Sequence, residues 1–207
     1  MKLAEVANKP DRFTTHLQTA SGENIIFRPL LHEDRERLTN FLESLSEETR
    51  RFWTLNSYDN SMAEELCDAI AKYDKLRMVA VTTDPTSPSI LAIMEIAFHL
   101  GGDDERFRSY GIELNAKETC RFGPCVRESE QGGGLANLLM PPLFELMKRF
   151  GMRQVILWGG VMQANRRAIK FYLKHDFRHA GQFDSPQTGA IFDMFRPIFP
   201  SFAHFFG

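Results

Sequence analysis

Hydrophobic residues in the first half of the chain recur with the periods of strands and helices. Residues 25–28 form a largely apolar run that predicts a short strand. The helical spacing i, i+3, i+4, i+7 follows, with Glu33 and Asp34 in the first turn, where acidic side chains favour the helix dipole. The apolar positions of this helix are Leu38, Phe41, Leu42 and Leu45. Ser61 and Glu64 have the spacing of a capping box and predict the start of a second helix.

Alternating strand and helix patterns fill the rest of the chain. Two largely apolar runs, 77–82 and 90–98, flank the proline-rich turn segment 84–88 and predict an antiparallel hairpin. This order of elements indicates an α/β fold with a mixed sheet. The other predicted strands are 120–126, 155–158, 180–183 and 190–195, and the other helices follow the glycines near 133 and span 166–175. Pro141 and Pro142 predict a kink or a break in the first of these helices.

The composition favours one globular domain. The chain has 207 residues, of which 43% are hydrophobic and 25% charged, so we expect a single domain over residues 1–207. Residues 1–22 are weakly patterned and predict a loosely attached arm. Phenylalanines crowd residues 196–207, and two roles fit this tail: packing on the parent domain, or contact with a second copy in a homodimer.

Charge and cysteine content exclude several classes of protein. The chain has 25 Lys+Arg and 27 Asp+Glu, a net charge of -2, which argues against binding nucleic acid by phosphate neutralisation. Cys67, Cys120 and Cys125 have no CxxC spacing, which argues against a disulfide framework or a structural metal site and favours a reducing compartment. The chain has neither an apolar run near the ~20 residues of a membrane span nor a signal-peptide core at its start, so we expect a cytoplasmic protein.

Three consecutive glycines, Gly132 to Gly134, lie between a predicted strand and a predicted helix. Glycine lets the backbone bring N–H groups close to a ligand, and the first N–H groups of a helix have no internal partner, so the turn suits a phosphate. A Walker P-loop needs Gly-Lys-Ser/Thr where Leu135, Ala136 and Asn137 stand, and a dinucleotide fingerprint needs a third glycine at Asn137. Two further interpretations are the pyrophosphate turn of coenzyme A acyltransferases, and a loop that only connects strand and helix.

Two segments of the chain resemble the GNAT superfamily of N-acetyltransferases. Gln131, Gly134 and Ala136 match the family's Gln/Arg-x-x-Gly-x-Gly/Ala signature, which begins five residues after the strand-end Val126. The segment NRRAIKFYLKHDF resembles the family's later Asn-x-x-Ala-x-x-x-Tyr element, with Asp176 in place of a glycine. The matching residues of this segment are Asn165, Ala168, Phe171, Tyr172 and Phe177.

The resemblance covers residues 25–195 and implies a mixed, mostly antiparallel central sheet, flanked by helices, with a splayed cleft that binds acetyl-CoA. In the family, backbone groups of the strand before the turn bind the pantetheine arm, and amides of the turn bind the pyrophosphate. The implied cofactor-binding residues are Cys125, Val126 and Arg127 for the arm, Gln131, Gly132, Gly133, Gly134, Leu135 and Ala136 for the pyrophosphate, and Asn165 and Phe171 beyond them. No metal is implied. Structural alternatives are a small buried hydrophobe for Cys125 and a helix N-cap for Asn165.

The resemblance also implies the reaction, which is transfer of an acetyl group from acetyl-CoA to a primary amine by direct attack in a ternary complex. Tyr172 is the implied general acid, because a phenol with a pKa of ~10 stays protonated at neutral pH and can protonate the departing thiolate. Its structural alternative is a core aromatic. Many family members place a basic glutamate where this chain has Cys120. Glu118 lies on the same side of a regular strand and is the tentative base, with Glu95 and Glu113 as further candidates.

Two other functions compete with this hypothesis, and the acceptor is open. The absence of a glutamate at Cys120 favours a non-catalytic acyl-CoA-binding regulator of the same fold. A nucleotide-binding enzyme that uses the glycine turn lacks its accompanying motifs. The acceptor amine belongs to a small molecule, or to a protein lysine or N-terminus. A basic helix face, made by Arg166, Arg167, Lys170 and Lys174, is either solvated or placed to meet the 3′-phosphate of the cofactor.

Overall fold

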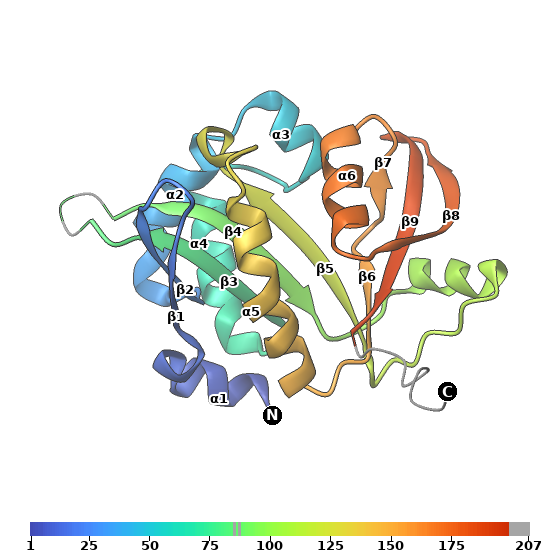
Figure 1. Ribbon diagram of the computed structural model, residues 1–207, viewed down its shortest axis with the longest axis horizontal. Coiled ribbons are helices and arrows are strands. Elements are labelled where there is room, and N and C mark those ends of the chain that lie inside the picture. Colours follow the sequence, from blue (N-terminus) through green and yellow to red (C-terminus); the bar gives the residue numbers. More distant parts are fainter. Residues whose placement is uncertain (85, 87, 199–207) are drawn as a thin grey trace.

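The computed structural model describes residues 1–84, 86 and 88–198, and in this part of the chain nine strands form one sheet (Figure 1). The strands are β1 (Thr15–Gln18), β2 (Asn24–Pro29), β3 (Lys75–Thr82), β4 (Ile90–Ala97), β5 (Thr119–Val126), β6 (Gln154–Leu157), β7 (Val161–Met162), β8 (Arg178–Ser185) and β9 (Gly189–Pro197). Their order is β1-β2-β3-β4-β5-β6-β9-β7, and β8 pairs with β9. Only β5 and β6 run parallel among the described pairs, so the sheet is mixed and mostly antiparallel, and the predicted β3–β4 hairpin is confirmed.

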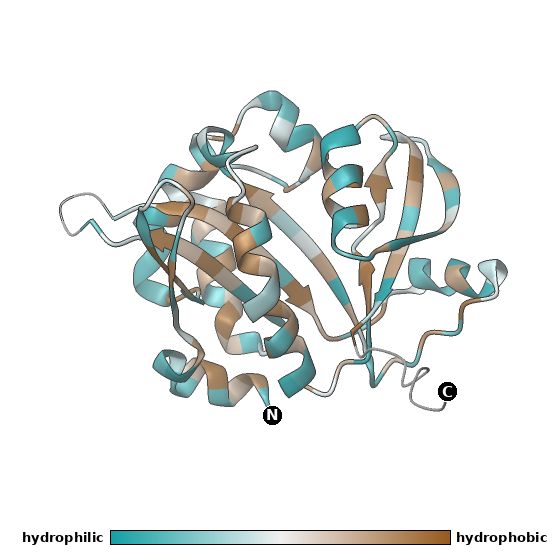
Figure 2. Ribbon diagram, viewed as in Figure 1, coloured by the Kyte–Doolittle hydropathy of each residue, from teal (hydrophilic) through white to brown (hydrophobic). Residues whose placement is uncertain are grey.

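Helices cover both faces of this sheet. The α-helices are α1 (Leu3–Asn8), α2 (Arg35–Glu43), α3 (Glu47–Phe52), α4 (Asn60–Asp68), α5 (Leu135–Arg149) and α6 (Arg166–Lys174), and the 3-10 helices are η1 (Pro10–Phe13), η2 (His32–Asp34), η3 (Ala69–Lys72), η4 (Gly102–Tyr110) and η5 (Glu128–Glu130). Alternate strand residues enter two cores: Met78 and Met94 pack with α5, whereas Val79 and Ile93 pack with α2 and α4. All of β4 is buried, and Figure 2 shows the hydrophobic colouring of these central strands.

The first 22 residues belong to the packed structure, so the prediction of a loosely attached arm is wrong. β1 pairs with β2 from Thr15 opposite Phe27 to Gln18 opposite Asn24. Val6 and Phe13 are buried in the core that contains α5. At the other end of the chain, β9 closes at Pro197 and Ile198 is buried. The predicted tail residues Phe199, Phe202, Phe205 and Phe206 lie outside the described residues.

Two local predictions about helices need correction. α5 continues through Pro141 and Pro142, so of the two predicted alternatives, a kink or a break, the break is wrong; the helix lacks the two N–H groups that proline cannot supply. α4 is capped by Asp59, whose carboxylate accepts from the N–H groups of Ser61 and Met62, and not by Ser61 itself. Among the described helices, none combines the length and the apolar character that crossing a bilayer requires.

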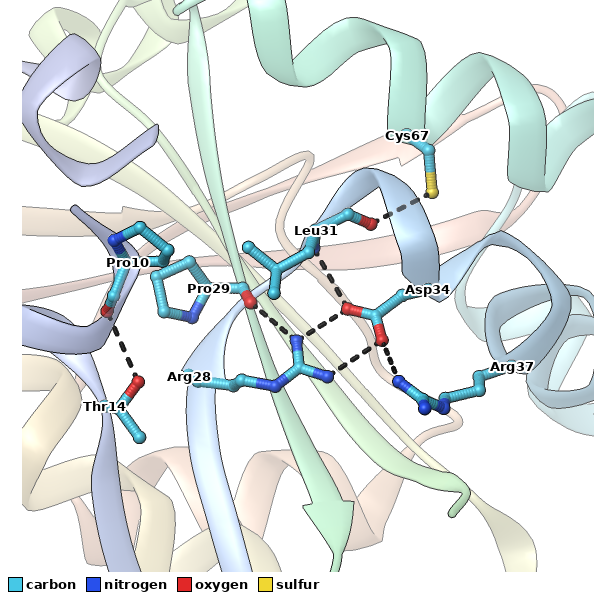
Figure 3. Close-up of polar contacts among 8 residues, drawn as sticks. All are labelled: Pro10, Thr14, Arg28, Pro29, Leu31, Asp34, Arg37 and Cys67. Atoms are coloured by element: carbon cyan, nitrogen blue, oxygen red, sulfur yellow. Dashed lines mark hydrogen bonds and ion pairs between the residues drawn. The ribbon is translucent and has the colours of Figure 1, made fainter. Parts of the chain in front are cut away.

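A buried carboxylate joins β2 to α2 (Figure 3). Asp34 is fully buried and accepts two hydrogen bonds from Arg28, at 2.6 and 2.8 Å, and one from Arg37 at 2.8 Å. The N–H of Leu31 donates to the same carboxylate at 3.0 Å. Burial opposes the charged form, but the Arg28 and Arg37 guanidinium groups and the Leu31 N–H outweigh it and hold the pKa of Asp34 below its ordinary value. Asp34 is therefore an ionised, fully hydrogen-bonded core group.

Candidate active site

The strands β5 and β6 separate beyond their short paired stretch (Figure 1), and a cavity lies beside the part of β5 that β6 leaves unpaired. The two strands pair only from Thr119 opposite Gln154 to Phe122 opposite Leu157, and the N–H of Trp158 still donates to the Phe122 carbonyl at 2.9 Å. Beyond this point β5 pairs with β4 alone. The free edge of β5 lines a cavity of about 960 Å³, which is the expected splayed cleft.

Backbone groups on the free edge of β5 point into this cavity. The N–H of Arg127 donates to the Leu91 carbonyl on the β4 side at 2.9 Å, and successive residues of a strand direct their polar groups to opposite edges, so the N–H of Val126 faces the gap. By the same alternation the backbone nitrogen of Pro124 faces the gap. Proline has no N–H, but no neighbouring strand of the described chain is paired there, so no hydrogen bond of the sheet is lost. The β4–β5 register runs without a shift through Gly123 and Pro124, so β5 has no bulge there.

The glycine turn closes one end of the cavity. Gly132 and Gly134 have φ values of +84° and +89°, a left-handed conformation that glycine adopts without strain. Gly134 is the N-cap of α5 and supplies no side chain to cap it. Within the described part of the chain, no backbone or side-chain hydrogen bond is donated by the N–H groups of residues 132–137. The turn and the first turn of α5 therefore form an anion site made of backbone amides.

α6 forms a second wall of the cavity. Asn165 caps this helix by accepting from the Ala168 N–H at 3.0 Å, and Phe171 and Tyr172 also line the cavity. Tyr172 is 7% exposed. Burial raises the pKa of the Tyr172 phenol, and nearby Cys125 acts in the same direction, so the phenol is a proton donor and not a phenolate. Burial likewise raises the pKa of the Cys125 thiol, with Glu128 adding to it, which fits a neutral buried group and not a nucleophile.

The far half of the cavity combines aromatic and acidic side chains from four segments. The residues are Phe52 at the end of α3 with Trp53 and Thr54 after it, Asp103 and Arg106 of η4, Trp158 after β6, and Phe183 and Asp184 of β8. The Arg106 guanidinium is already neutralised, because it donates to the buried Asp193 carboxylate at 2.6 and 2.8 Å and lies over the Phe183 ring. Tyr110 donates to the same carboxylate at 3.1 Å. Asp193 thus fastens η4 to the β8–β9 hairpin.

The cavity brings together most of the predicted cofactor residues and the predicted general acid. The cofactor residues that line it are Cys125, Val126, Gln131, Gly132, Gly134, Leu135, Ala136, Asn165 and Phe171, and Tyr172 lines it with them. Arg127 follows Val126 and Gly133 lies between Gly132 and Gly134, but neither of them lines the cavity. Of the basic face on α6, Arg167 alone reaches the lining.

The structure places the tentative base Glu118 away from the cavity. Glu118 precedes the first residue of β5, about 25 Å along that strand from Val126 at ~3.3 Å per residue. Its carboxylate pairs with Arg153 at 3.2 Å and accepts from Asn115. The other candidate on the sheet, Glu95, is buried in an ion pair with Arg77 at 2.9 Å. Neither residue lines the cavity, and neither does Glu113.

The carboxylates that do line the cavity were not predicted. Asp103 and Asp184 reach it from η4 and β8, and Glu130 reaches it from the glycine turn. The sequence signal at Asp103 was only a polar loop with glycines, and nothing near Asp184 distinguishes it from a surface residue. Both depend on how the β8–β9 hairpin and η4 pack on each other, which the local pattern does not encode.

Gly160 allows the loop after β6 to approach β9. Its φ is +76°, and a Cβ there would lie 2.5 Å from Ile191 Cγ2 and 2.7 Å from the Phe192 carbonyl oxygen. We expect Gly160→Ala to lower the free energy of unfolding by about 2 kcal/mol, from ~1–2 kcal/mol of left-handed strain plus overpacking. Urea unfolding measures this. Gly159→Ala, at φ +69° with open space, is the control and shows strain alone; equal losses in both variants would contradict the contact.

The comparisons with known proteins agree with this geometry. The profile of the acetyltransferase (GNAT) family matches residues 107–177, which contain β5, the glycine turn and α6. The chain is 29% identical over 154 residues to an acetyltransferase of Pseudomonas aeruginosa, and the alignment covers 72% of each. The GNAT domain of S. lividans PAT superimposes with a TM-score of 0.65 at 18% identity, covering 91% of this chain and 98% of that one.

A second solved structure has the same fold. The aminoglycoside acetyltransferase AAC(6′)-Ib, solved in complex with coenzyme A, superimposes with a TM-score of 0.64 at 18% identity. The match covers 84% of this chain and 93% of that one. The sequence motifs, the GNAT family profile over residues 107–177 and the fold agree, and each shows that the chain is similar to the GNAT superfamily of acetyltransferases.

Proposed function

We propose that this protein transfers an acetyl group from acetyl-CoA to a primary amine that attacks the thioester directly while both substrates are bound. The observation that carries the proposal is that one cavity contains both the free edge of β5 and the amides of residues 132–137. Backbone amides at a helix N-terminus suit a diphosphate, and a free strand edge suits an extended amide-containing arm such as pantetheine. The likeness to a structure solved with coenzyme A supports the same assignment.

The residues of the cavity divide the chemistry between them. The Val126 N–H polarises the thioester carbonyl and stabilises the charge that develops on its oxygen as the amine nitrogen attacks the carbon. When the carbon–sulfur bond breaks, Tyr172 donates its phenolic proton to the departing sulfur and recovers a proton from solvent. The amine loses its proton to water in the open cavity; the predicted bases Glu118 and Glu95 both lie outside it. Positioning two substrates side by side supplies much of the rate.

The acceptor half of the cavity suits an amine. Asp103 and Asp184 place carboxylates there, and the only cation in its lining on η4, Arg106, is neutralised by Asp193. Trp53, together with the other aromatic side chains in this half, offers ring faces that attract cations. An acceptor bound in its ammonium form therefore meets complementary charge before it loses its proton.

Calorimetric titration with acetyl-CoA tests the cofactor, with NAD and ATP as controls, and amine-dependent release of free thiol tests the transfer. We expect saturable binding of acetyl-CoA alone, followed by thiol release with at least one amine. Binding without thiol release on any amine would favour the regulatory alternative, which the buried Cys120 at the family's base position supports. Failure to bind acetyl-CoA would remove the proposal.

The backbone of the glycine turn gives a sharper test. We expect Gly134→Val to weaken acetyl-CoA binding about tenfold, because a branched residue at φ +89° costs ~1–2 kcal/mol and ~1.4 kcal/mol is a factor of ten. Gly151→Val is the matched control: Gly151 has φ +82° and open space, but lies past the other end of α5. Both variants lose stability, and only the first loses affinity. Equal affinity in the two variants would show that the turn does not hold the cofactor.

A further inference from the structure

α3 is a short helix that is fastened to the glycine turn. Glu128, in the segment between Val126 and the glycines, accepts hydrogen bonds from the N–H and the Oγ of Ser46, the N-cap of α3, at 2.9 and 2.5 Å. Gln131 donates from Nε2 to Thr49 Oγ1 at 3.4 Å and to the Val126 carbonyl at 2.7 Å. Two side chains of the turn therefore hold two successive parts of α3.

The Glu128 contact is charged. Burial would raise the pKa of this carboxyl, but hydrogen bonds from Ser46 and Thr49 outweigh burial and lower the pKa to about 2. Glu128 is consequently ionised throughout the neutral range, and a hydrogen bond to a charged acceptor is roughly twice as strong as a neutral one. The Gln131 contact adds to it at Thr49, which is the one buried residue of α3.

The other end of α3 belongs to the acceptor half of the cavity. The residues that follow the bonded positions, Phe52, Trp53 and Thr54, all line it. α3 spans about 9 Å at ~1.5 Å per residue, so the same short helix connects the phosphate end of the cavity with its acceptor end. A change in how well the turn is ordered therefore changes how well Trp53 and its neighbours are held in place.

We infer that Glu128 and Gln131 are positioning residues that transmit occupancy of the glycine turn to the acceptor wall through α3. The inference rests on the proposed function, because it takes coenzyme A as the ligand of the turn. The amides of residues 132–137 have no hydrogen-bond partner within the described residues, so a bound diphosphate adds hydrogen bonds that order this turn further. When the turn is already ordered, ordering α3 costs less conformational entropy. Binding at one end of the cavity is thereby coupled to order at the other end without any new contact.

Hydrogen–deuterium exchange of the full-length protein tests this coupling, with and without saturating coenzyme A. The reporters are the amides of Arg50 and Trp53, which bond to the carbonyls of Ser46 and Thr49 within α3. We expect coenzyme A to slow their exchange about fivefold or more, the lower end of coupling between sites in proteins. Calorimetry on the same samples establishes that coenzyme A is bound.

Variants in the turn separate positioning from general loosening. Glu128→Ala removes the acceptor and is expected to lose most of the protection while still binding coenzyme A. Glu128→Gln keeps an oxygen for Ser46 and is expected to retain part of it. Glu130→Ala is the matched control, because Glu130 carries the same charge in the same turn, but among the described residues its side chain accepts a hydrogen bond only from Ser129. If Glu128→Ala does not fold, Ser46→Ala breaks the same bridge from the α3 side.

Each outcome decides the matter. Bound coenzyme A with no change at Arg50 and Trp53 in the wild type overturns the inference and leaves the proposed function standing. Equal loss of protection in Glu128→Ala and Glu130→Ala also overturns it, because the effect would then follow charge in the turn. Absence of coenzyme A binding in the wild type overturns both. Loss in Glu128→Ala alone supports the inference.

Discussion

We expect replacement of Tyr172 with phenylalanine to lower kcat for acetyl transfer about a hundredfold and to leave the dissociation constant for acetyl-CoA unchanged. A positioned general acid typically accelerates a reaction by a factor of ~10²–10⁴, and the substitution removes only the hydroxyl group that would act as this acid. Phenylalanine keeps the ring and with it the contacts to Phe171 and Phe177. Steady-state kinetics of thiol release, combined with calorimetry, measures the two quantities separately.

The control for this substitution is Tyr73→Phe, which removes a phenol that is 46% exposed and does not line the cavity. It should leave kcat unchanged. An unchanged kcat in Tyr172→Phe would show that sulfur departs without help from this phenol. A weaker affinity for acetyl-CoA with a normal kcat would assign Tyr172 to packing, the alternative that its sequence context also allowed.

The direction of the Tyr172 pKa makes a second, independent prediction about pH. Because burial raises the pKa above the ordinary value of 10.0, the phenol is protonated at every pH at which the protein operates. Loss of this acid therefore does not lower kcat as pH rises from 7 to about 10, and deprotonation of the amine raises it instead. A fall in wild-type kcat below pH 10 that is absent from Tyr172→Phe would contradict the raised pKa.

The parts of the fold that the sequence predicted are those decided by local chemistry. Prolines in the segment 84–88 and the apolar runs around it are enough to predict the β3–β4 hairpin. The three glycines at 132–134 predict a turn between a strand and a helix, and the left-handed φ values at Gly132 and Gly134 show a backbone that glycine adopts without strain. The N-cap alternative for Asn165 is likewise confirmed by a contact three residues away. In each case the deciding groups are close in sequence.

The parts that could not be predicted depend on contacts between distant segments. β1 is short and weakly patterned, and it becomes a strand because β2 offers it an edge. On a regular strand the Glu118 side chain points to the same face as residue 120, the base position of the family. Glu118 nevertheless precedes β5 and lies at the end where β5 and β6 are paired, away from the cavity. Ser61 had the right spacing for a capping box, but the helix begins earlier, because the Asp59 carboxylate accepts from the N–H groups of Ser61 and Met62 and Ser61 already lies inside the first turn.

Asp34 is another residue whose role depends on contacts that the sequence pattern does not show. Its substitution is expected to have the largest effect on stability. From the sequence it is a helix-start acid whose value is a few tenths of a kcal/mol, whereas in the fold it is the buried partner of Arg28 and Arg37 (Figure 3). We expect Asp34→Asn to lower the free energy of unfolding by about 3–5 kcal/mol, because it leaves buried guanidinium charge without its counter-ion. Denaturant unfolding measures this loss at neutral pH.

The control is Glu64→Gln, which breaks the exposed ion pair of Arg35 and Glu64, whose side chains are 53% and 50% exposed. A pair of this kind contributes about 0–1 kcal/mol, so the two substitutions remove one carboxylate each and differ only in burial. A loss below 1 kcal/mol in Asp34→Asn would show that the arginines find other partners or water when the carboxylate is gone.

Acid should then reproduce in the wild type what Asp34→Asn does at neutral pH. The pKa of Asp34 is lower in the folded state than its ordinary value of 3.8, so its contribution to stability is complete above pH 3.8 and is lost as pH falls through the folded pKa. The wild-type unfolding free energy consequently drops more steeply in this acid range than that of Asp34→Asn, and the two curves converge. Parallel curves from pH 7 to pH 2 would mean that the carboxylate titrates alike in the folded and unfolded chains, and that its bonds to Arg28 and Arg37 contribute nothing to the free energy of folding.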